Sequence, residues 1–443
     1  MTTRIRTLLF YVLLAFFITG GGSAIFYSQG WRIDFAEFTL QRTGAIFVQS
    51  IPKNTRISLE GTSIKNESGI LQAGTLIDGL LPHTYALHLE QEGFLPWEKR
   101  ATVLPELVTK YEHIILMPQR EATTTVLKTP VSPPNNSPLA ITFDANKNAY
   151  LLKDRTNSAT SPKITNLSAL FKTLRETQLR LPGVASLRDV LISPSDSRML
   201  ILLSEEARGG IYLLRTDTQK LQKISGDSPV AVAVNSKEII WSNQRHSIVS
   251  YDFSTTTVLY PSPFTQTRKI AFSPSGDKVG LLEDNDSFYL LDRAKNAPLL
   301  LSSSTKNFEF SPDNQKIALV ELGDTLRVYD FSREKEMRMR LPVGASPLHL
   351  LWHQDSEHLF VITSDSILFS EVDGELPLNI YPIAKDITLS GAKKNEFDLT
   401  THSVSNTVDA HKSVFYNSRT STIYFLKGNT LFEFSFEESI SEQ

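Results

Sequence analysis

The chain opens with an uncharged, strongly hydrophobic stretch, Thr7 to Tyr27. A helix over these residues is about long enough to cross the hydrocarbon core of a bilayer. Because a segment in lipid has to satisfy its own backbone hydrogen bonds, the pattern predicts a transmembrane helix at residues 7–27. Arg4 and Arg6 precede it, and positive residues tend to stay cytoplasmic. The short N-terminus, residues 1–6, is therefore expected inside, and everything after Tyr27 is expected outside the cytoplasm.

A cleaved signal peptide is the competing interpretation of the same stretch. Residues 8–18 form an acceptable apolar region, and the small residues 20–24 resemble a cleavage site. Apolar side chains resume at residues 25–27, which favours an uncleaved anchor with Tyr27 and Trp31 at the outer interface. We therefore expect a single-pass membrane protein, and the alternative is a secreted one. Both interpretations place the body of the chain outside the cytoplasm.

After a juxtamembrane connector at residues 28–42, the pattern changes to short runs in which apolar and polar positions alternate. Such period-two runs, bounded by Gly and Pro, predict short antiparallel strands with one buried face. The runs that show it best are residues 46–49, 57–60, 85–90 and 111–116. A small β domain is expected over residues 43–118. A domain of this size needs its aromatic side chains for burial, so Phe94 and Trp97 are expected in its core, with sugar stacking as the alternative.

Three segments of this domain resemble a known family, the PEGA domain. They are residues 44–52 (GAIFVQSIP), 57–61 (ISLEG) and 92–97 (EGFLPW). The matching positions are Gly44, Pro52, Gly61, Gly93, Phe94 and Trp97. The sequence departs from the family at residues 52–55 (PKNT), where Pro-x-Gly-Ala is usual. The resemblance implies a small β-sandwich-like module of cell-surface proteins, used as a spacer or a binding module.

Residues 119–138 are rich in proline, which cannot donate to the hydrogen-bond ladder of a sheet. The prolines are Pro130, Pro133, Pro134 and Pro138. This composition predicts a linker, with room for one short strand at residues 125–127.

The remainder of the chain repeats itself. Residues 272–283 (FSPSGDKVGLLE) align with residues 310–321 (FSPDNQKIALVE) at an offset of 38 residues (310 − 272). Further copies begin near residues 139, 192, 230, 350 and 413. A period near 40 with about four short strands per unit predicts a β-propeller, because each unit has an open face that only its neighbours can bury. We expect the propeller over residues 139–437, with about seven blades and six or eight as alternatives, before a tail at 438–443.

The clearest repeats carry a turn signature, Ser-Pro followed by Gly, Asn or Asp. Proline sets φ at the first corner of the turn, and Gly, Asn or Asp tolerates the second corner. The residues concerned are Ser193, Pro194, Ser273, Pro274, Gly276, Ser311, Pro312 and Asp313. These segments resemble the WD40-like or TolB-like propeller family, in which Phe-Ser-Pro-Asp-Gly recurs. The resemblance implies the β-propeller fold.

Three aspartates, Asp252, Asp292 and Asp330, stand where true WD40 blades have the Trp-Asp pair. They recur at equivalent positions of several repeats, which is typical of turn residues. We therefore expect them to stabilise turns, with catalysis as the alternative.

One segment departs from the β pattern. Residues 166–180 place Leu167, Leu170, Phe171 and Leu174 at helical spacing. Ser168 is positioned to cap the start of this helix. Because the apolar stripe is short, we expect a helix packed on one end or edge of the ring, with a partner-binding helix as the alternative.

Composition limits the chemistry that this chain can carry. It has no cysteine, which excludes disulfides, thiol nucleophiles and Cys-ligated metals. A net charge of −3 gives no electrostatic support for a nucleic-acid partner. No Gly-rich phosphate loop, His-Glu-x-x-His, EF-hand or Gly-x-Ser-x-Gly motif occurs. The sequence therefore predicts no cofactor and no catalytic residue.

Three histidines stand close together in the sequence, His349, His353 and His358. On a strand, His349 and His353 share a face but lie about 13 Å apart, which is too far for one metal ion. His358 follows a turn and has room to approach, but no pattern of carboxylates supports a site. We therefore expect no metal here.

A second candidate metal site is the acidic run Glu283, Asp284 and Asp286. Such a run between two strands is typical of a solvated hairpin loop, with calcium binding as the alternative. We expect the hairpin loop.

The architecture and the lack of a catalytic motif favour a non-enzymatic function. We expect a membrane-anchored extracytoplasmic binding or scaffold protein that presents its propeller to a protein or glycan ligand at the cell envelope. An anchored hydrolase or lyase with its site in the central channel is the alternative. A third hypothesis, from the resemblance to TolB-like propellers, is an assembly component of an envelope complex.

Overall fold

The computed structural model describes residues 3–34, 38–69, 72–120, 122–124, 139–143, 149–153, 163–181, 186–193, 196, 198–204, 210–227, 229, 231–260, 265–295, 297–323, 325–342, 347–387, 414–418, 421–427 and 430–436. Over these residues the chain is mostly β-strand, with two α-helices, which confirms the predicted fold class. The chain divides into two compact units. Unit 1 holds Met1–Arg120 and Gly374–Asn379, and unit 2 holds Glu121–Asp373 and Ile380–Gln443.

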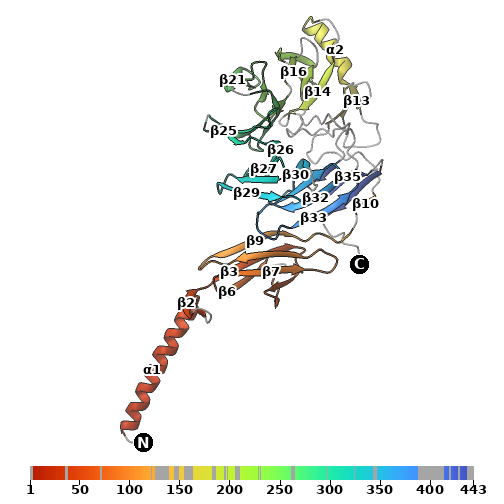
Figure 1. The fold of residues 1–443 in the computed structure, drawn as a ribbon. Helices are drawn as coiled ribbons and strands as arrows, with labels where there is room; N and C mark the ends of the chain where they lie inside the picture. Colours follow the sequence, from red (N-terminus) through yellow and green to blue (C-terminus); the bar gives the residue numbers. More distant parts are fainter. Residues whose placement is uncertain are drawn as a thin grey trace. The chain divides into compact units, whose positions relative to one another are not determined.

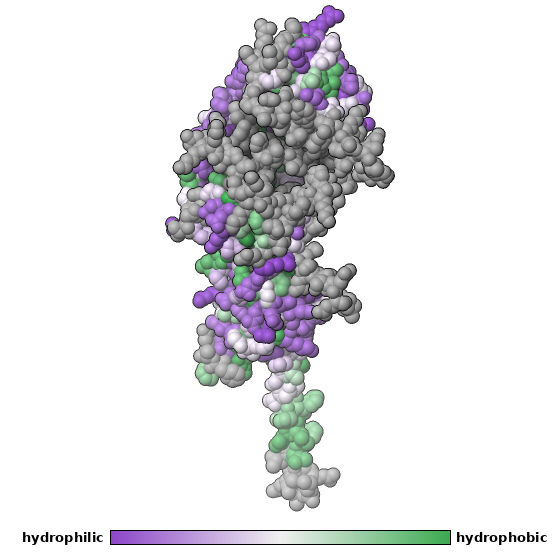
Figure 2. Space-filling model, turned by 90° about the vertical axis from the view of Figure 1, so that its right-hand side faces the viewer, coloured by the Kyte–Doolittle hydropathy of each residue, from purple (hydrophilic) through white to green (hydrophobic). Residues whose placement is uncertain are grey.

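The N-terminal helix α1 (Thr3–Ser28) is present as predicted (Figure 1). Its stretch Leu9–Ser28 has a mean hydropathy of 2.0 and is not buried against any described part of the chain. The exposed apolar surface of this helix appears green in Figure 2. Its length and composition suit either a membrane span or a signal sequence. Arg4 and Arg6 belong to its first turn, and the orientation across a membrane that they predict stays a prediction.

A short hairpin occupies the predicted connector between the helix and the β domain. It consists of β1 (Trp31–Asp34) and β2 (Thr39–Arg42). The guanidinium of Arg32 lies 3.4 Å from the ring centroid of Tyr27, near the end of α1. Such a cation–π contact connects the helix end to the hairpin.

Unit 1 continues as two packed sheets with the strand orders β6-β3-β9 and β5-β4-β7-β8. The strands are β3 (Gly44–Ile51), β4 (Arg56–Leu59), β5 (Thr62–Ile64), β6 (Thr75–Leu80), β7 (Thr84–Glu90), β8 (Trp97–Thr102) and β9 (Val108–Ile115). The four alternating runs of the sequence coincide with β3, β4, β7 and β9, as predicted. Alternate residues, Ile46 with Val48 and Leu87 with Leu89, are buried in one core between the sheets. One pairing differs from the expected antiparallel pattern, because β3 and β9 run parallel.

The glycines of the PEGA-like motif stand where a side chain has no room or where the backbone is left-handed. A Cβ on Gly44 would lie 2.3 Å from the carbonyl oxygen of Leu104. Gly61 and Gly93 have φ angles of +75° and +81°, which glycine adopts without steric cost. These positions therefore serve the fold of the domain.

The remaining residues of this motif are structural as well. Trp97 is fully buried, and its ring meets that of Tyr111 edge-to-face at 5.6 Å. Phe94 is half-buried and packs against the same core. The prediction that both aromatic rings serve the core is confirmed. Pro52 accepts a hydrogen bond from Ser50 Oγ at 2.9 Å, in the turn before β4.

The described part of unit 2 holds seven sheets that follow one another along the chain (Figure 1). The first contains β11 (Leu139–Phe143), β12 (Ala149–Lys153) and β13 (Lys163–Asn166). The next two contain β14 (Leu187–Ile192), β15 (Met199–Ser204), β16 (Gly210–Arg215) and β17 (Lys220–Ser225), then β18 (Val232–Val234), β19 (Ile239–Ser242), β20 (Ile248–Tyr251) and β21 (Thr256–Tyr260).

The fourth and fifth sheets are formed by the two repeats that match best in sequence. They contain β22 (Thr267–Phe272), β23 (Lys278–Glu283), β24 (Phe288–Asp292) and β25 (Ala297–Ser302), then β26 (Thr305–Phe310), β27 (Lys316–Glu321), β28 (Thr325–Asp330) and β29 (Lys335–Arg340). The sixth contains β30 (Pro347–Trp352), β31 (His358–Thr363), β32 (Ser366–Glu371) and β33 (Ile380–Lys385), and the seventh contains β34 (Val414–Asn417), β35 (Thr422–Lys427) and β36 (Thr430–Ser435). One antiparallel sheet per repeat is the construction of a β-propeller. The number of blades in the ring stays a prediction.

Inner strands of these blades are covered on both faces. Along β15, Leu200 and Leu202 belong to a core within their own blade and helix α2, whereas Ile201 and Leu203 belong to a core shared with the next blade. All four side chains are buried, as the solid apolar run predicts. Because each blade buries one face of its neighbour, no single blade has a complete core.

A strand from the start of unit 2 completes the last sheet. β10 (Thr123–Thr124) pairs antiparallel with β36, and the sheet order is β10-β36-β35-β34. The N-terminal end of the propeller thus contributes the fourth strand of the last blade. These two residues lie within the predicted linker, 119–138, and the short strand predicted at residues 125–127 falls outside the described residues.

Helix α2 (Leu167–Gln178) is present where the sequence predicts it. Its buried side chains Leu167, Phe171 and Leu174 pack on the blade of β14–β17, so this is a helix that covers the ring. One detail of the prediction is wrong. The N-cap is Asn166, whose Oδ1 accepts the N–H of Ala169 at 2.9 Å, and not Ser168. Ser168 is already inside the first turn, because β13 runs directly into the helix.

Candidate functional site: the turns between first and second strands

The signature turns join the first strand of a blade to the second. Ser273 precedes β23 and Ser311 precedes β27. In both turns the serine N–H donates to the carbonyl of the residue five positions later, Lys278 or Lys316, at 2.9 Å. His353 makes the same bond to His358 at 2.9 Å. The segment 353–358 is therefore a third copy of the turn, in a blade where the Ser-Pro signature is absent.

The third residue after the start of each turn has a left-handed backbone. The φ angles are +76° at Gly276, +64° at Asn314 and +59° at Ser356. This explains the recurrence of Gly and Asn at that place, since both adopt positive φ readily. Pro274 and Pro312 occupy the first corners, and Ser193 begins the corresponding turn before β15. Pro194 falls outside the described residues.

In these turns the serine side chain forms a hydrogen bond with an aspartate side chain. Ser311 Oγ accepts the N–H of Lys316 at 2.8 Å and donates to Asp313 Oδ1. Ser273 Oγ accepts the N–H of Lys278 at 3.1 Å and donates to Asp277 Oδ1 at 2.8 Å. Partial burial raises the pKa of the Asp277 carboxyl, but the ammonium of Lys278 and the hydroxyls of Ser275 and Ser273 outweigh it and hold that pKa well below its usual range. The signature residues described here therefore stabilise the turns.

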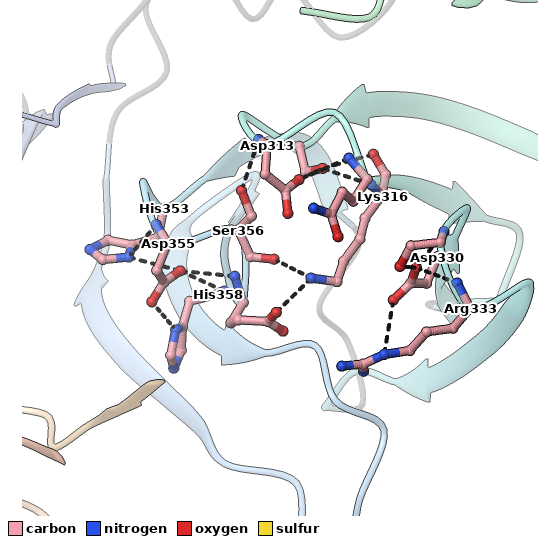
Figure 3. Close-up of polar contacts among 12 residues, drawn as sticks. Asp313, Lys316, Asp330, Arg333, His353, Asp355, Ser356 and His358 are labelled. Carbon is pink, nitrogen blue, oxygen red and sulfur yellow. Dashed lines mark hydrogen bonds and ion pairs between the residues drawn. The ribbon is translucent and has the colours of Figure 1, made fainter. Parts of the chain in front are cut away.

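Successive turns are also joined to one another (Figure 3). Asn314 donates through Nδ2 to Asp277 Oδ1 of the preceding blade at 3.2 Å. In the other direction, Asp313 N–H donates to Ser356 Oγ at 3.1 Å. Lys316 Nζ reaches Glu357 Oε1 at 2.6 Å. Side-chain bonds thus run from blade to blade along this end of the sheets.

The third turn brings together two histidines and an aspartate. Asp355 Oδ1 lies 3.0 Å from His353 Nδ1, and Asp355 Oδ2 lies 2.7 Å from His358 Nδ1 (Figure 3). Both imidazoles are almost fully buried, and the Asp355 carboxylate keeps a small exposed area. One nitrogen from each ring and one carboxylate oxygen lie within 4.8 Å of one another. Imidazole nitrogen and carboxylate oxygen are both ligand types that transition-metal ions accept.

Aromatic rings and a second carboxylate surround this cluster. The His358 ring stacks on Phe369 at 4.9 Å, and the His353 ring lies 5.5 Å from Tyr416 and 5.9 Å from Phe436. On its far side, His358 Nε2 faces Glu371 Oε1 at 3.9 Å.

Burial and the carboxylate act on the two charges in opposite directions. Burial disfavours a charged imidazole, but the Asp355 carboxylate outweighs it and raises the pKa of His358 above its ordinary value. Burial likewise disfavours a charged carboxylate, yet the two imidazoles hold the pKa of Asp355 well below its usual range. Both directions correspond to a charged His358 imidazole beside an ionised Asp355 carboxylate.

The sequence places His349 and His353 too far apart for one metal ion and leaves room for His358 to approach. His349 lies on β30 and is not a member of the cluster, whereas His358 is brought to His353 by the turn. Asp355 was missed because no carboxylate motif surrounds it in the sequence. The signal was present in the repeat, since His353 and Asp355 align with Ser311 and Asp313 at an offset of 42 residues (353 − 311).

The acidic run is a hairpin between β23 and β24, as predicted. Asp286 pairs with Arg268 at 2.8 Å and also with Lys306. These basic groups lower the pKa of Asp286 despite its burial. Glu283 is buried and accepts the N–H of Thr265 at 2.7 Å. Two of the three carboxylates, those of Glu283 and Asp286, thus already form hydrogen bonds or ion pairs with protein groups.

The aspartates at the Trp-Asp positions accept backbone hydrogen bonds in tight turns. Asp330 Oδ1 accepts the N–H groups of Ser332 at 2.9 Å and Arg333 at 3.1 Å. Asp252 Oδ1 accepts the N–H of Thr255 at 2.7 Å, and Asp292 Oδ1 that of Ala294 at 3.0 Å. The prediction that they are turn residues is confirmed.

Comparison with known proteins adds little to this picture. No known protein family matches the chain, and no curated protein matches it. A chain of the solved structure described as "Crystal Structure of Mitotic Checkpoint Complex" aligns with a TM-score of 0.43 and 11% identity, over 71% of this chain and 96% of that chain. A chain of "YCF48 bound to D1 peptide" aligns with a TM-score of 0.41 and 12% identity, over 71% of this chain and 99% of that one. TM-scores below 0.5 carry no argument about function.

Proposed function

We propose that this chain is a membrane-anchored extracytoplasmic scaffold, whose ring of blades presents a rigid surface to a protein or glycan ligand at the cell envelope. The supporting observation is that the polar side chains that recur in the blades form hydrogen bonds within their own turns. Asp252, Asp277, Asp313 and Asp330 each accept hydrogen bonds from their own turns. Hydrogen bonds of this kind hold the turns, and with them the surface of the ring, in shape.

The anchor is the second part of the proposal. Helix α1 exposes apolar side chains that water would solvate poorly, and a lipid bilayer would cover them. With the positive flank inside, the β domain and the ring lie outside the cytoplasm. The β domain then serves as a PEGA-like spacer, consistent with a compact core that takes up Trp97 and part of Phe94.

Topology can be tested sharply because the chain has no cysteine. We would introduce Lys237→Cys on an exposed position of the ring and, as the matched control, Thr3→Cys at the start of α1. A membrane-impermeant maleimide applied to intact cells should label the first variant and leave the second unlabelled. The reverse pattern would overturn the topology, and recovery of the Lys237→Cys protein from the medium with a shortened N-terminus would overturn the anchor.

Binding can be tested by site-specific photo-crosslinking in native membranes. Gln315 is exposed in the turn before β27, which joins the first and second strands of its blade. Asn285 is exposed in the hairpin after β23, which joins the second and third strands of the preceding blade and therefore lies at the other end of the strands. A photo-reactive residue at one of these two positions should capture a defined envelope partner, and the other position serves as its control. Failure of both positions, or hydrolysis of glycan or peptide libraries by the purified full chain, would refute the scaffold proposal.

A further inference from the structure

We propose that His353, Asp355 and His358 form a binding site for a divalent transition-metal ion, with zinc as the ion that fits best. The site lies in the turn between β30 and β31, where the sequence predicts no metal. This inference does not depend on the scaffold proposal.

The donor atoms are already close to the spacing that a metal needs. Ligands bound to zinc at about 2.1 Å in a tetrahedron lie roughly 3.4 Å from one another. The two nitrogen-to-oxygen distances to Asp355 are 3.0 Å and 2.7 Å, and the three donor atoms lie within 4.8 Å of one another. Small side-chain rotations would therefore open the cluster around an ion.

The far nitrogen of His358 is the second observation that points to a ligand. This Nε2 is buried and has no hydrogen-bond partner within the part of the chain that the structure describes. It faces Glu371 Oε1 at 3.9 Å. Histidines that bind a metal through one ring nitrogen usually donate the other N–H to a carboxylate, which orients the ring. Glu371 Oε1 at 3.9 Å is too far for this hydrogen bond, but it is the carboxylate toward which this Nε2 points, and a small rotation would bring the two into range.

The two preceding blades have a different residue at the position of His358. At the position of His358 they carry Lys278 and Lys316, whose ammonium groups supply a permanent positive charge beside turn carboxylates. In the third turn an imidazole stands at that position. His353 Nδ1 lies 3.0 Å from Asp355 Oδ1 and 3.4 Å from the backbone N of Asp355, so a metal ion would take the place of these contacts. A bound cation satisfies the lone pairs and the carboxylate together.

The chemistry of the donors selects the class of ion. Two imidazole nitrogens and one carboxylate suit Zn²⁺ and related ions, whereas Ca²⁺ and Mg²⁺ prefer oxygen donors alone. The exposed part of the Asp355 carboxylate leaves a path from solvent, through which water can complete the coordination.

Metal binding here would strengthen the contact with the last blade. The ring of His353 packs against Tyr416 on β34 and against Phe436, which follows β36. An ion that holds His353 in place thus holds the surface against which the last blade packs.

The test uses the full chain in detergent, with any affinity tag removed, stripped by a chelator and then dialysed against Zn²⁺. We expect about one bound zinc ion per chain by elemental analysis and a thermal midpoint raised by about 5 °C at saturating zinc. Cobalt substitution should give visible absorption bands typical of nitrogen and oxygen ligands. The His358→Gln and Asp355→Asn variants should lose the zinc, the midpoint shift and the cobalt bands.

Matched controls separate this site from other histidines and turns. Asp313→Asn changes the equivalent turn carboxylate of the preceding blade, and His246→Gln changes an exposed histidine. Both should keep the zinc and the midpoint shift. The proposal is overturned if wild-type protein takes up no zinc above the His358→Gln level. If the site variants fail to fold, wild-type protein that shows neither a midpoint shift with zinc nor cobalt absorption overturns it equally.

Discussion

The buried ammonium of Lys269 on β22 donates a 2.9 Å hydrogen bond to Asn307 Oδ1 on β26, the first strand of the next blade. The same Nζ donates to the carbonyl of Phe308 at 2.7 Å and lies 4.5 Å from the centroid of the Phe308 ring. Lys269 is about 1% exposed, so its charge depends on these partners and on the carboxylate of Glu309, which lies 3.5 Å from Nζ. A polar link between first strands therefore adds to the apolar packing between these two blades.

Replacing the acceptor Asn307 alone should lower the free energy of unfolding more than replacing both Asn307 and Lys269. Asn307→Ala leaves a buried ammonium with one partner fewer, which should lower the free energy of unfolding by about 1–3 kcal/mol. Adding Lys269→Met removes the buried charge and should recover part of that loss. Urea unfolding of the four proteins completes the cycle. A double variant less stable than Asn307→Ala would contradict this account.

The acid sensitivity of the ring should depend on turn aspartates such as Asp330. Partial burial raises its pKa, but hydrogen bonds from Ser332 and Arg333 outweigh this, so its folded-state pKa lies below the ordinary value. The stabilisation is therefore complete above the unfolded-state pKa of about 3.9 and disappears as the pH falls through the folded value. Asp330→Asn should lower stability by about 1–2 kcal/mol at pH 7, with the difference shrinking below about pH 4. Thermal midpoints of both proteins across pH 2 to 8 measure it, and a constant difference across that range would disprove the assignment.

Gly44→Ala should destabilise the β domain because its Cβ would lie 2.3 Å from the Leu104 carbonyl oxygen. Backbone on both sides has to shift, which should cost about 1–3 kcal/mol. Gly69→Ala is the matched control, since no atom lies within 4 Å of its Cβ. Chemical unfolding followed by Trp97 fluorescence, in variants whose other three tryptophans are replaced by phenylalanine, reports on this domain. Equal stability of the two variants would refute the steric explanation.

The pairing of β10 with β36 should protect the last blade from opening. Replacing Thr123 and Thr124 by proline removes two backbone donors from the edge of that sheet. Hydrogen exchange at residues 430–435 should then accelerate at least about tenfold, corresponding to about 1.4 kcal/mol of lost protection. Residues 358–363 on β31 are the internal control and should keep their rates. Unchanged exchange in β36 would show that the strand does not close the sheet.

The sequence predicts the structure best where a segment depends on a local turn or on a repeating pattern of apolar and polar residues. The charge-free stretch predicts α1, the alternating runs predict β3, β4, β7 and β9, and the 38-residue offset predicts equivalent blades. Each depends on a side-chain period that is readable from neighbouring residues alone. The Ser273 and Ser311 turns are likewise predictable, because their φ requirement selects particular residue types.

Partners that are distant in the sequence could not be predicted in this way. Nothing near Thr123 indicates that it pairs with Glu433, and nothing near Lys269 names Asn307 as its acceptor. The same holds for His353, which meets Phe436 only when the last blade folds against it. Closure of the ring determines these contacts.

The sequence by itself therefore determined the class of each segment of this protein: an apolar helix, a small β domain, a proline-rich stretch and a series of β repeats. Only the tertiary structure decided that His353, Asp355 and His358 form one cluster, with Glu371 behind it. The physical reason is that periodicity reports which face of a strand is buried, whereas a site depends on distances between side chains that a turn and a neighbouring strand bring together.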